Sequence, residues 1–181
     1  MRKALFFLGC MNQSDIEWVV RNGSKQRLAK GAVLIQEGQP TDSLFFLLSG
    51  RLSVSIRAAG QVAVLETGEV VGEISFVDSR PPTASVTALV DCEVGVVPRR
   101  QLTVKLAQDQ VFAAHFYQAI AIFLADRLRT TTANVGGKRA QLSEDIEDID
   151  EIGSHLLDTV SVAGNRFAEM QRRPWGGGAS S

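Results

Sequence analysis

The chain has 181 residues, of which 45% are hydrophobic, so it is long enough for one domain with a sizeable core and an appended segment. Its formal net charge is -1 and its pI is near 6.1, so no overall attraction to nucleic acid or to an anionic membrane surface is expected. No run approaches the roughly twenty consecutive apolar residues of a membrane-spanning helix, so none is predicted.

Two cysteines bear on the compartment. Cys10 and Cys92 are far apart and in no paired spacing, which predicts free thiols in a reducing compartment, the cytoplasm. The N-terminus offers an alternative, because Arg2-Lys3 and the apolar run that ends at Cys10 resemble a miniature export signal. That run is very short and leads directly into a helix start, so cytoplasmic localisation is the prediction and export is the alternative.

The first predicted element is a helix over residues 4–22. Ser14 and the two acidic residues that follow it have the spacing of a capping box, and the aliphatic residues after them share one helical face. Asn22-Gly23 ends this helix.

Short strands separated by glycines follow. Residues 28–35 form a turn into a β-branched strand, and residues 37–42 form a loop rich in turn formers. Further strands are predicted at Leu44–Leu48, Leu52–Arg57, Val62–Glu66, Val70-Val71, Ala84–Val90 and Glu93–Val97. Several short strands at close spacing predict an antiparallel sandwich or roll.

The segment from Gly72 to Val86 interrupts the strands and has the features of an anion-binding turn. Gly72 permits close backbone approach, and the residues after it can form a short helical turn whose first N–H groups are free. Glu73 can accept hydrogen bonds from a pair of hydroxyl groups, but its charge repels a phosphate at the same distance. The segment therefore predicts two subsites separated by charge.

These residues resemble a known motif. Gly72-Glu73-Ile74-Ser75-Phe76, followed by Pro81 and Ala84-Ser85-Val86, is similar to the phosphate-binding cassette of the cyclic nucleotide-binding domain family. The turn glycines also match that family's pattern over roughly residues 5–135; they are Gly31, Gly38, Gly50, Gly68 and Gly72. The resemblance implies a mainly β fold, an antiparallel β-roll or jelly roll of the cyclic nucleotide-binding type with flanking helices. A generic β-roll without ancestry to the family is the alternative.

The resemblance also implies a ligand site. In that family the glycine, the glutamate and the turn hold ribose and cyclic phosphate, which here assigns Gly72, Glu73, Ile74 and Ser75. The family's phosphate-pairing arginine follows the proline directly, and this chain has Pro82 there, which offers neither a cation nor an N–H. Losing a charge-assisted hydrogen bond of about 1.5–3 kcal/mol weakens binding roughly ten- to a hundredfold. Binding of cyclic AMP or cyclic GMP is therefore expected to be weak or absent.

Two neighbouring side chains are candidates for compensating the missing arginine. Arg80 lies two residues upstream, where its guanidinium is a candidate to cover the same phosphate, and Thr83 is a candidate hydroxyl donor. The alternative is that Arg80-Pro81-Pro82 is a stiff solvated turn and that Thr83 only begins a strand.

Two helices are predicted after Pro98, at Arg99–Gln108 and Val111–Thr132. The longer one repeats apolar residues at three- and four-residue steps, namely Phe112, Phe116, Ile120, Phe123, Leu124 and Leu128. Such spacing is usually core, but the family commonly uses this helix to cover the pocket and to pair with a second subunit, which implies a homodimer through these residues. Thr131-Thr132 resemble the hydroxyl pair that contacts adenine in bacterial catabolite activator proteins; an accidental pair at a helix end is the alternative.

Gly136-Gly137 predict a hinge between a domain of residues 1–135 and a C-terminal segment of residues 136–173. A heptad repeat from Leu142 to Met170 predicts an amphipathic helix, acidic at its start and basic at its end. Antiparallel pairing across a dimer, packing on the same subunit's roll, and docking of a protein partner through residues 142–170 all stay open. Residues 174–181 are predicted to be a disordered tail.

Several chemistries find no support in the sequence. His115 and His155 have no cysteine or carboxylate at ligand spacing, and the acidic run of residues 144–151 lacks the turning glycine of a calcium loop, so no metal site or catalytic group is predicted. Bacterial relatives often carry a helix-turn-helix after the long helix, but residues 137–173 read as one heptad stretch with an acidic first half. Nucleic-acid binding is therefore not expected.

The sequence as a whole predicts a non-enzymatic regulatory or sensor module, stand-alone and without a DNA-binding domain. The alternative is a dimerising scaffold that has lost its ligand and binds a protein partner through its C-terminal helix.

Overall fold

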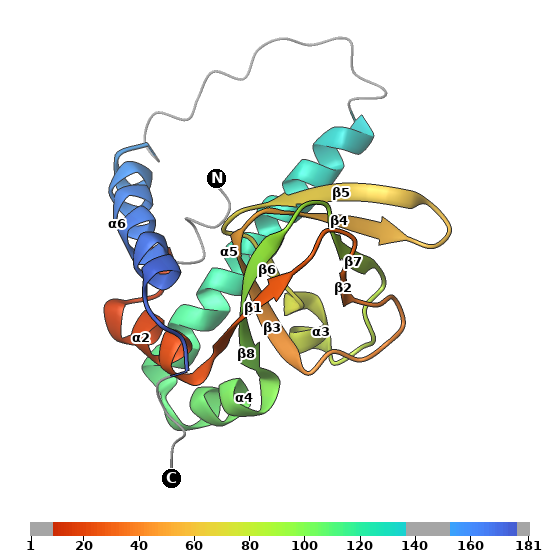
Figure 1. Cartoon of the computed structure of the whole chain (residues 1–181). Coiled ribbons are helices and arrows are strands. Elements are labelled where there is room, and N and C mark those ends of the chain that lie inside the picture. Colours follow the sequence, from red (N-terminus) through yellow and green to blue (C-terminus); the bar gives the residue numbers. More distant parts are fainter. Residues whose placement is uncertain (1–8, 137–152, 177–181) are drawn as a thin grey trace.

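The computed structural model describes residues 9–136 and 153–176. Within these residues the strands form two antiparallel four-stranded sheets, and Figure 1 shows their arrangement. The first sheet has the order β1 (Ser24–Leu28), β8 (Cys92–Pro98), β3 (Ser43–Ser49) and β6 (Val70–Val71). The second has the order β2 (Val33–Ile35), β7 (Ser85–Ala88), β4 (Arg51–Ile56) and β5 (Gly60–Glu66). The predicted antiparallel β-roll with flanking helices is confirmed.

Strand β3 lies between two hydrophobic clusters, because successive side chains of a strand point to opposite faces. Phe45 and Leu47 face the roll interior, where they pack with residues of both sheets such as Leu52 and Val94. Phe46 and Leu48 face the other way, into a cluster made with the helices. The first sheet is therefore covered on both faces, and its central strand is buried along most of its length.

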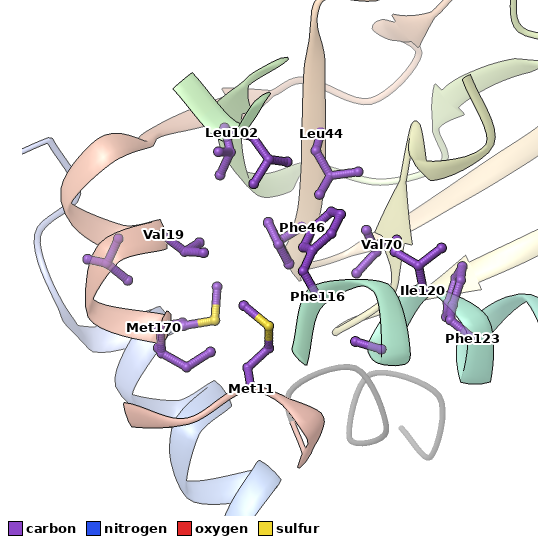
Figure 2. Packing of buried hydrophobic residues seen from close by; sticks show 14 of the residues in the cluster. Met11, Val19, Leu44, Phe46, Val70, Leu102, Phe116, Ile120, Phe123 and Met170 are labelled. Atoms are coloured by element: carbon purple, nitrogen blue, oxygen red, sulfur yellow. The ribbon is translucent and has the colours of Figure 1, made fainter. Parts of the chain in front are cut away.

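The helix-side core joins α2 (Gln13–Asn22), α5 (Gln110–Gly136) and α6 (Gly153–Arg172) to the first sheet, as Figure 2 shows. Phe112 and Phe116 of α5 are stacked with ring centroids 6.2 Å apart, and both are fully buried. Met11 and Met170 fill the space between α2, α5 and α6 (Figure 2). This cluster accounts for the apolar face of α5 from Phe112 to Leu124.

Two shorter helices complete the roll. α3 (Glu73–Asp78) is the short turn predicted after Gly72, and α4 covers Arg99–Gln108, the range predicted from the sequence. Asp109 lies between α4 and α5. Its Oδ1 accepts the Phe112 N–H of the first turn of α5 at 2.9 Å, and its Oδ2 pairs with Lys105 Nζ of α4 at 2.7 Å.

The start of the first helix differs from the prediction. α2 begins at Gln13, and its N-cap is Asn12, whose side chain accepts the Asp15 N–H at 2.9 Å while Asp15 accepts the Asn12 N–H at 2.7 Å. The predicted N-cap, Ser14, donates its hydroxyl to Asn12 instead. Both residue types cap helices well, so only the chain geometry decides between them. Residues 4–8 of the predicted helix lie outside the described residues.

Strand β1 was missed because its sequence, Ser-Lys-Gln-Arg-Leu, is polar. It lies at the edge of the first sheet, where only its last residue, Leu28, is buried, and it pairs with β8 from Ser24↔Val96 to Leu28↔Cys92. An edge strand needs no apolar face along its length, so its pairing comes from a distant segment.

The C-terminal segment packs on the same chain, which was one of the three predicted arrangements. α6 begins at Gly153 and lies beside α2 (Figure 1), with Ala163 and Met170 fully buried. Residues 142–152, the first part of the predicted helix, lie outside the described residues. The predicted disordered tail is wrong for residues 174–176, because Trp175 packs against the helix-side core.

Within residues 9–136 and 153–176, no helix is both long and apolar enough to cross a lipid bilayer.

Candidate ligand pocket

A cavity of about 180 Å³ opens at the end of the roll, between the second sheet and α3. Its wall is mostly apolar, with polar groups gathered on α3 and the loop that follows. The lining residues are Ile35, Val54, Leu65, Val71, Gly72, Glu73, Ile74, Ser75, Asp78, Arg80, Pro81, Pro82, Thr83, Ala84 and Val86. All seven cassette residues predicted to bind a ligand line this one cavity: Gly72, Glu73, Ile74, Ser75, Arg80, Pro82 and Thr83.

Gly72 sets the direction in which the chain enters the pocket. Its φ of 92° is left-handed, a conformation that favours glycine, and a Cβ added there would lie 3.0 Å from the Ser43 carbonyl oxygen. α3 starts at the next residue, so its first N–H groups have no partner within the helix. The predicted glycine and helical turn are therefore present at the pocket wall.

Glu73 is the most buried charged side chain of the wall. It is 1% exposed, and Ser75, one residue beyond Ile74, is 6% exposed. A carboxylate in this place accepts hydrogen bonds only, so it suits a ligand that offers hydroxyl or amino hydrogens. Ile74 is 48% exposed and adds an apolar side chain at the mouth.

Arg99 holds the far end of α3, and sequence reasoning missed it. Its Nη1 donates to the Ser75 carbonyl at 2.8 Å, and its Nη2 donates to the Phe76 carbonyl at 3.3 Å and to Ser79 Oγ at 2.9 Å. The guanidinium also lies 5.3 Å from the centroid of the Phe76 ring. These bonds satisfy two of the last four carbonyls of a helix of only six residues. No local signal marks this arginine, since it is 24 residues from Ser75 in the chain.

Arg80 is the cation among the described lining residues, and its side chain is exposed. Its backbone N–H donates to Asp78 Oδ1 at 3.0 Å, which fixes the turn out of α3. With Glu73 and Asp78 in the same wall, the described lining carries two carboxylates and one guanidinium. A negatively charged ligand is therefore repelled unless it lies near Arg80 and the N–H groups of α3.

Pro82 has a structural role at the position where the resemblance leads one to expect a cation. Its carbonyl accepts the Gly38 N–H at 2.8 Å, which ties the cassette loop to the loop between β2 and β3. Thr83, one residue further, is exposed and lines the cavity.

Thr131 and Thr132, the predicted base-contacting pair, belong to α5, but the structure does not describe their side chains.

Four of the six residues predicted to form a dimer interface belong to the chain's own core instead. Phe112, Phe116, Ile120 and Phe123 are between 0 and 3% exposed in the helix-side cluster, so they have no surface left for a second subunit. Leu124 packs partly against that cluster, and Leu128 is 69% exposed.

His115 has a carboxylate partner that lies far away in sequence. Its Nδ1 is 2.8 Å from Asp15 Oδ2, across a separation of 100 residues, and Asp15 is 5% exposed. The pair joins α5 to the cap of α2 and lies outside the pocket lining. Among the described residues no three histidine, cysteine or acidic side chains gather as metal ligands would. The side chain of His155 lies outside the described residues.

The roll resembles known proteins in both sequence and fold. Residues 25–109 match the family model described as "Cyclic nucleotide-binding domain". Over these residues the chain is similar to the cyclic nucleotide-binding domain family. A cyclic nucleotide-binding domain from Methylobacillus flagellatus has a similar fold, with a TM-score of 0.67 and 22% identity over 80% of this chain and 85% of that one.

Two further proteins resemble this chain over most of its length. The catabolite activator protein of Thermus thermophilus shares the fold, with a TM-score of 0.57 and 19% identity over 88% of this chain and 84% of that one. The cGMP-dependent protein kinase egl-4 of Caenorhabditis briggsae is 28% identical over 166 residues, which are 89% of this chain and 21% of the kinase. The chain thus spans about a fifth of that kinase's length. Among the described residues after α5, the single helix α6 follows and no helix-turn-helix is seen.

Proposed function

We propose that the chain is a non-enzymatic regulatory module that senses a cyclic nucleotide, cyclic AMP or cyclic GMP, in the pocket beside α3. The observation that carries the proposal is the arrangement of Gly72 and Glu73: a left-handed glycine opens α3 at the pocket wall, and a buried carboxylate follows it. The kinase relative, which is named for its dependence on cGMP, supports the same ligand class.

Each polar group of the wall has a distinct part in this proposal. Glu73 accepts hydrogen bonds from the ribose hydroxyl, and the N–H groups of the first turn of α3 face the phosphate. Arg80 supplies the positive charge that Pro82 lacks, and Thr83 adds a hydroxyl. The aliphatic walls from β2, β4 and β7 receive the base. Because the one arginine is exposed and lies two residues from the family's arginine position, weak binding is predicted.

The proposed response to the ligand is closure of α5 over the pocket, by a shift of a pre-existing equilibrium. α5 is already in contact with the cassette helix, because Phe116 meets Phe76 of α3 edge to face with centroids 5.6 Å apart. A movement of α3 on ligand binding therefore acts directly on the core that seats α5. Arg99 ties the same helix to the start of α4, which precedes α5.

Isothermal titration calorimetry with cyclic AMP and cyclic GMP tests this proposal. We expect saturable binding to the wild type that is lost in Glu73→Gln, a change that keeps the size of the buried side chain. Arg80→Ala is expected to weaken binding roughly tenfold or more, the effect of removing one charge-assisted hydrogen bond. Lys30→Ala, an exposed cation outside the pocket lining, is the matched control. Absence of heat from the wild type up to millimolar nucleotide would reject the sensor.

The proposal includes a homodimer that pairs through the exposed face of α5, in place of the buried residues first predicted for the interface. Tyr117, Ala121, Leu124 and Leu128 follow one another at steps of four, three and four residues, the spacing of a helical seam. Tyr117 is 51% exposed and Leu128 is 69% exposed, and Ala121 between them is exposed too. Leu124 packs partly against the chain's own core, whereas the core leaves the other three residues of this stripe exposed.

Sedimentation velocity of an Ala121→Glu variant tests the seam, because a charge in its centre opposes pairing while leaving the core intact. The expected result is a monomer, whereas Gln118→Glu, one exposed position off the seam, keeps the dimer. A monomeric wild type, or a dimer unaffected by Ala121→Glu, would reject this interface. The alternative of a partner-binding C-terminal helix is less favoured, because the apolar residues Ala163 and Met170 are already buried in the chain itself.

A further inference from the structure

The last part of the chain crosses the helix-side core and the first sheet. Residues 163–176, the end of α6 and the turn after it, are here called the strap. Ala163 and Met170 of the strap are fully buried, and Phe167 packs against the same cluster. Figure 2 shows Met170 beside Met11 in the cluster that also holds Phe116 of α5. The strap therefore shares one core with the helix that is proposed to close over the pocket.

The anchor of the strap is the indole of Trp175. It lies over Gly23 and Gly95. A Cβ added to Gly23 would be 2.7 Å from a ring carbon, and a Cβ added to Gly95 would be closer still. Gly95 sits in the interior of β8, opposite Lys25 on one side and Phe46 on the other. Glycine weakens a strand interior and often marks the close approach of another group. Here that group is Trp175, so the two glycines form its seat.

Hydrogen bonds tie the strap to three other elements. Trp175 Nε1 donates to the Met170 carbonyl at 2.8 Å, which closes the turn after α6. Gln171 Nε2 donates to the Leu48 carbonyl of β3, and Lys25 Nζ of β1 donates to the Gln171 carbonyl, both at 2.5 Å. The Gly176 N–H donates to the Val20 carbonyl of α2 at 3.2 Å. All of these bonds fit the present positions of α2 and the first sheet.

The helix-side core under the strap is connected to the pocket through β6 and through α3. Val70 of β6 is buried in the helix-side cluster, and the next two residues, Val71 and Gly72, line the pocket. Phe76 of α3 packs against the same cluster and touches Phe116. A change in the packing of α5 therefore alters the surroundings of both the strap and the pocket wall.

We propose that the strap is an autoinhibitory latch that holds α5 in the position shown and opposes its closure over the pocket. The inference rests on the proposed function, in which ligand binding moves α5. Because the strap's contacts are made with the present arrangement, they stabilise that arrangement and lower the fraction of molecules competent to close. The apparent affinity for the ligand is the intrinsic affinity multiplied by that competent fraction. Because coupling is reciprocal, bound ligand in turn weakens the packing of the strap.

Calorimetry on the full-length chain compares the wild type with Trp175→Ala, using cyclic AMP and cyclic GMP as probes. Removing the anchor is expected to tighten binding by about fivefold or more, the lower end of typical coupling between sites. Arg172→Ala, an exposed residue on the same helix, is expected to bind as the wild type does. Trp175→Phe fills most of the seat but loses the bond to Met170, so its affinity should fall between the two.

A second readout follows the strap itself. The chain has two tryptophans, so in a Trp18→Phe background the emission reports Trp175 alone. Saturating nucleotide is expected to move this emission to longer wavelength, because the indole leaves its seat for water.

The outcomes separate the latch from the sensor. Equal or weaker binding by a folded Trp175→Ala protein, checked by circular dichroism, overturns the latch and leaves the sensor intact. If Trp175→Ala does not fold, Gln171→Ala and Trp175→Phe decide by the same comparison. No binding by the wild type or by any variant rejects the sensor, and the latch with it.

Discussion

The guanidinium of Arg99 donates a 2.8 Å hydrogen bond to the Ser75 carbonyl, and so fixes the end of α3 from the start of α4. α3 is a helix of six residues, which on its own would be marginal in water. The shape of the pocket wall therefore depends on a side chain that does not line the pocket.

Arg99→Ala should accordingly weaken both the fold and the pocket. Loss of hydrogen bonds from a charged donor is expected to lower the free energy of unfolding by about 1.5–3 kcal/mol. Urea denaturation measures this loss, and nucleotide titration should show weaker binding with Glu73 still in place. The exposed neighbour Arg100 is the control, and Arg100→Ala should leave both quantities unchanged. An Arg99→Ala protein as stable as the wild type would show that α3 holds its position unaided.

The seat of Trp175 predicts a non-additive pair of substitutions. Gly95→Ala places a methyl group where the indole lies, and overpacking of this kind typically costs about 1–3 kcal/mol. In a Trp175→Ala background the same change meets empty space, so its cost should largely disappear. A double-mutant cycle from urea denaturation measures the difference. Additive costs would mean that Gly95→Ala acts through the strand and not through Trp175.

Asp109 predicts a pH dependence of stability. The hydrogen bond from Lys105, with a smaller contribution from the Phe112 N–H, lowers the pKa of Asp109 below its usual value. A lowered pKa means that the ionised cap stabilises the fold above the unfolded-state pKa of about 3.9 and that this contribution is lost as the pH falls through the lower folded value. Asp109→Ala should therefore unfold at a lower temperature than the wild type at pH 7.

The difference in melting temperature between the wild type and Asp109→Ala should shrink on acidification below about pH 4. Asp109→Asn keeps an acceptor for the Phe112 N–H and loses the charge, so it should retain part of the stability with little pH dependence. A difference that is the same at pH 3 and pH 7 would contradict the assigned cause.

The two cysteines should be slow to react in the folded protein. Burial raises the pKa of the Cys10 thiol, so less thiolate is present at pH 8 than in a free cysteine. Cys92 is buried, and its thiol donates to the carbonyls of Val90 and Arg51. Labelling with iodoacetamide, followed residue by residue with mass spectrometry, should speed up sharply for both in urea. Rapid labelling of Cys10 without urea would contradict its place in the helix-side core.

The sequence predicted what depends on local chemistry. Glycine-punctuated strands, the turn after Gly72 and the range of α4 follow from residues that are neighbours in the chain, and each is present. The seven cassette residues line one cavity because they come from one continuous segment, α3 and the loop after it, whose conformation depends mainly on its own residues.

The features that the sequence did not predict depend on contacts between residues that are far apart in the chain. β1 is polar and becomes a strand only by pairing with β8, and Arg99 and Trp175 act on segments that are remote in sequence. The apolar face of α5 could not be divided by periodicity alone between its own core and a second subunit, because both need the same spacing. Only the packing of Phe112 against α2 and of Phe116 against α3 shows that these residues belong to the chain's own core.

Strand β3, whose alternate residues serve the roll interior and the helix-side core, imposes a constraint on the whole chain. A deletion of one residue between Leu44 and Leu48 would turn every later side chain of the strand to the opposite face. Both clusters would then lose their central residues at once. The roll and the helical layer are thus expected to melt together in a single transition, and this strand is expected to tolerate no change of length.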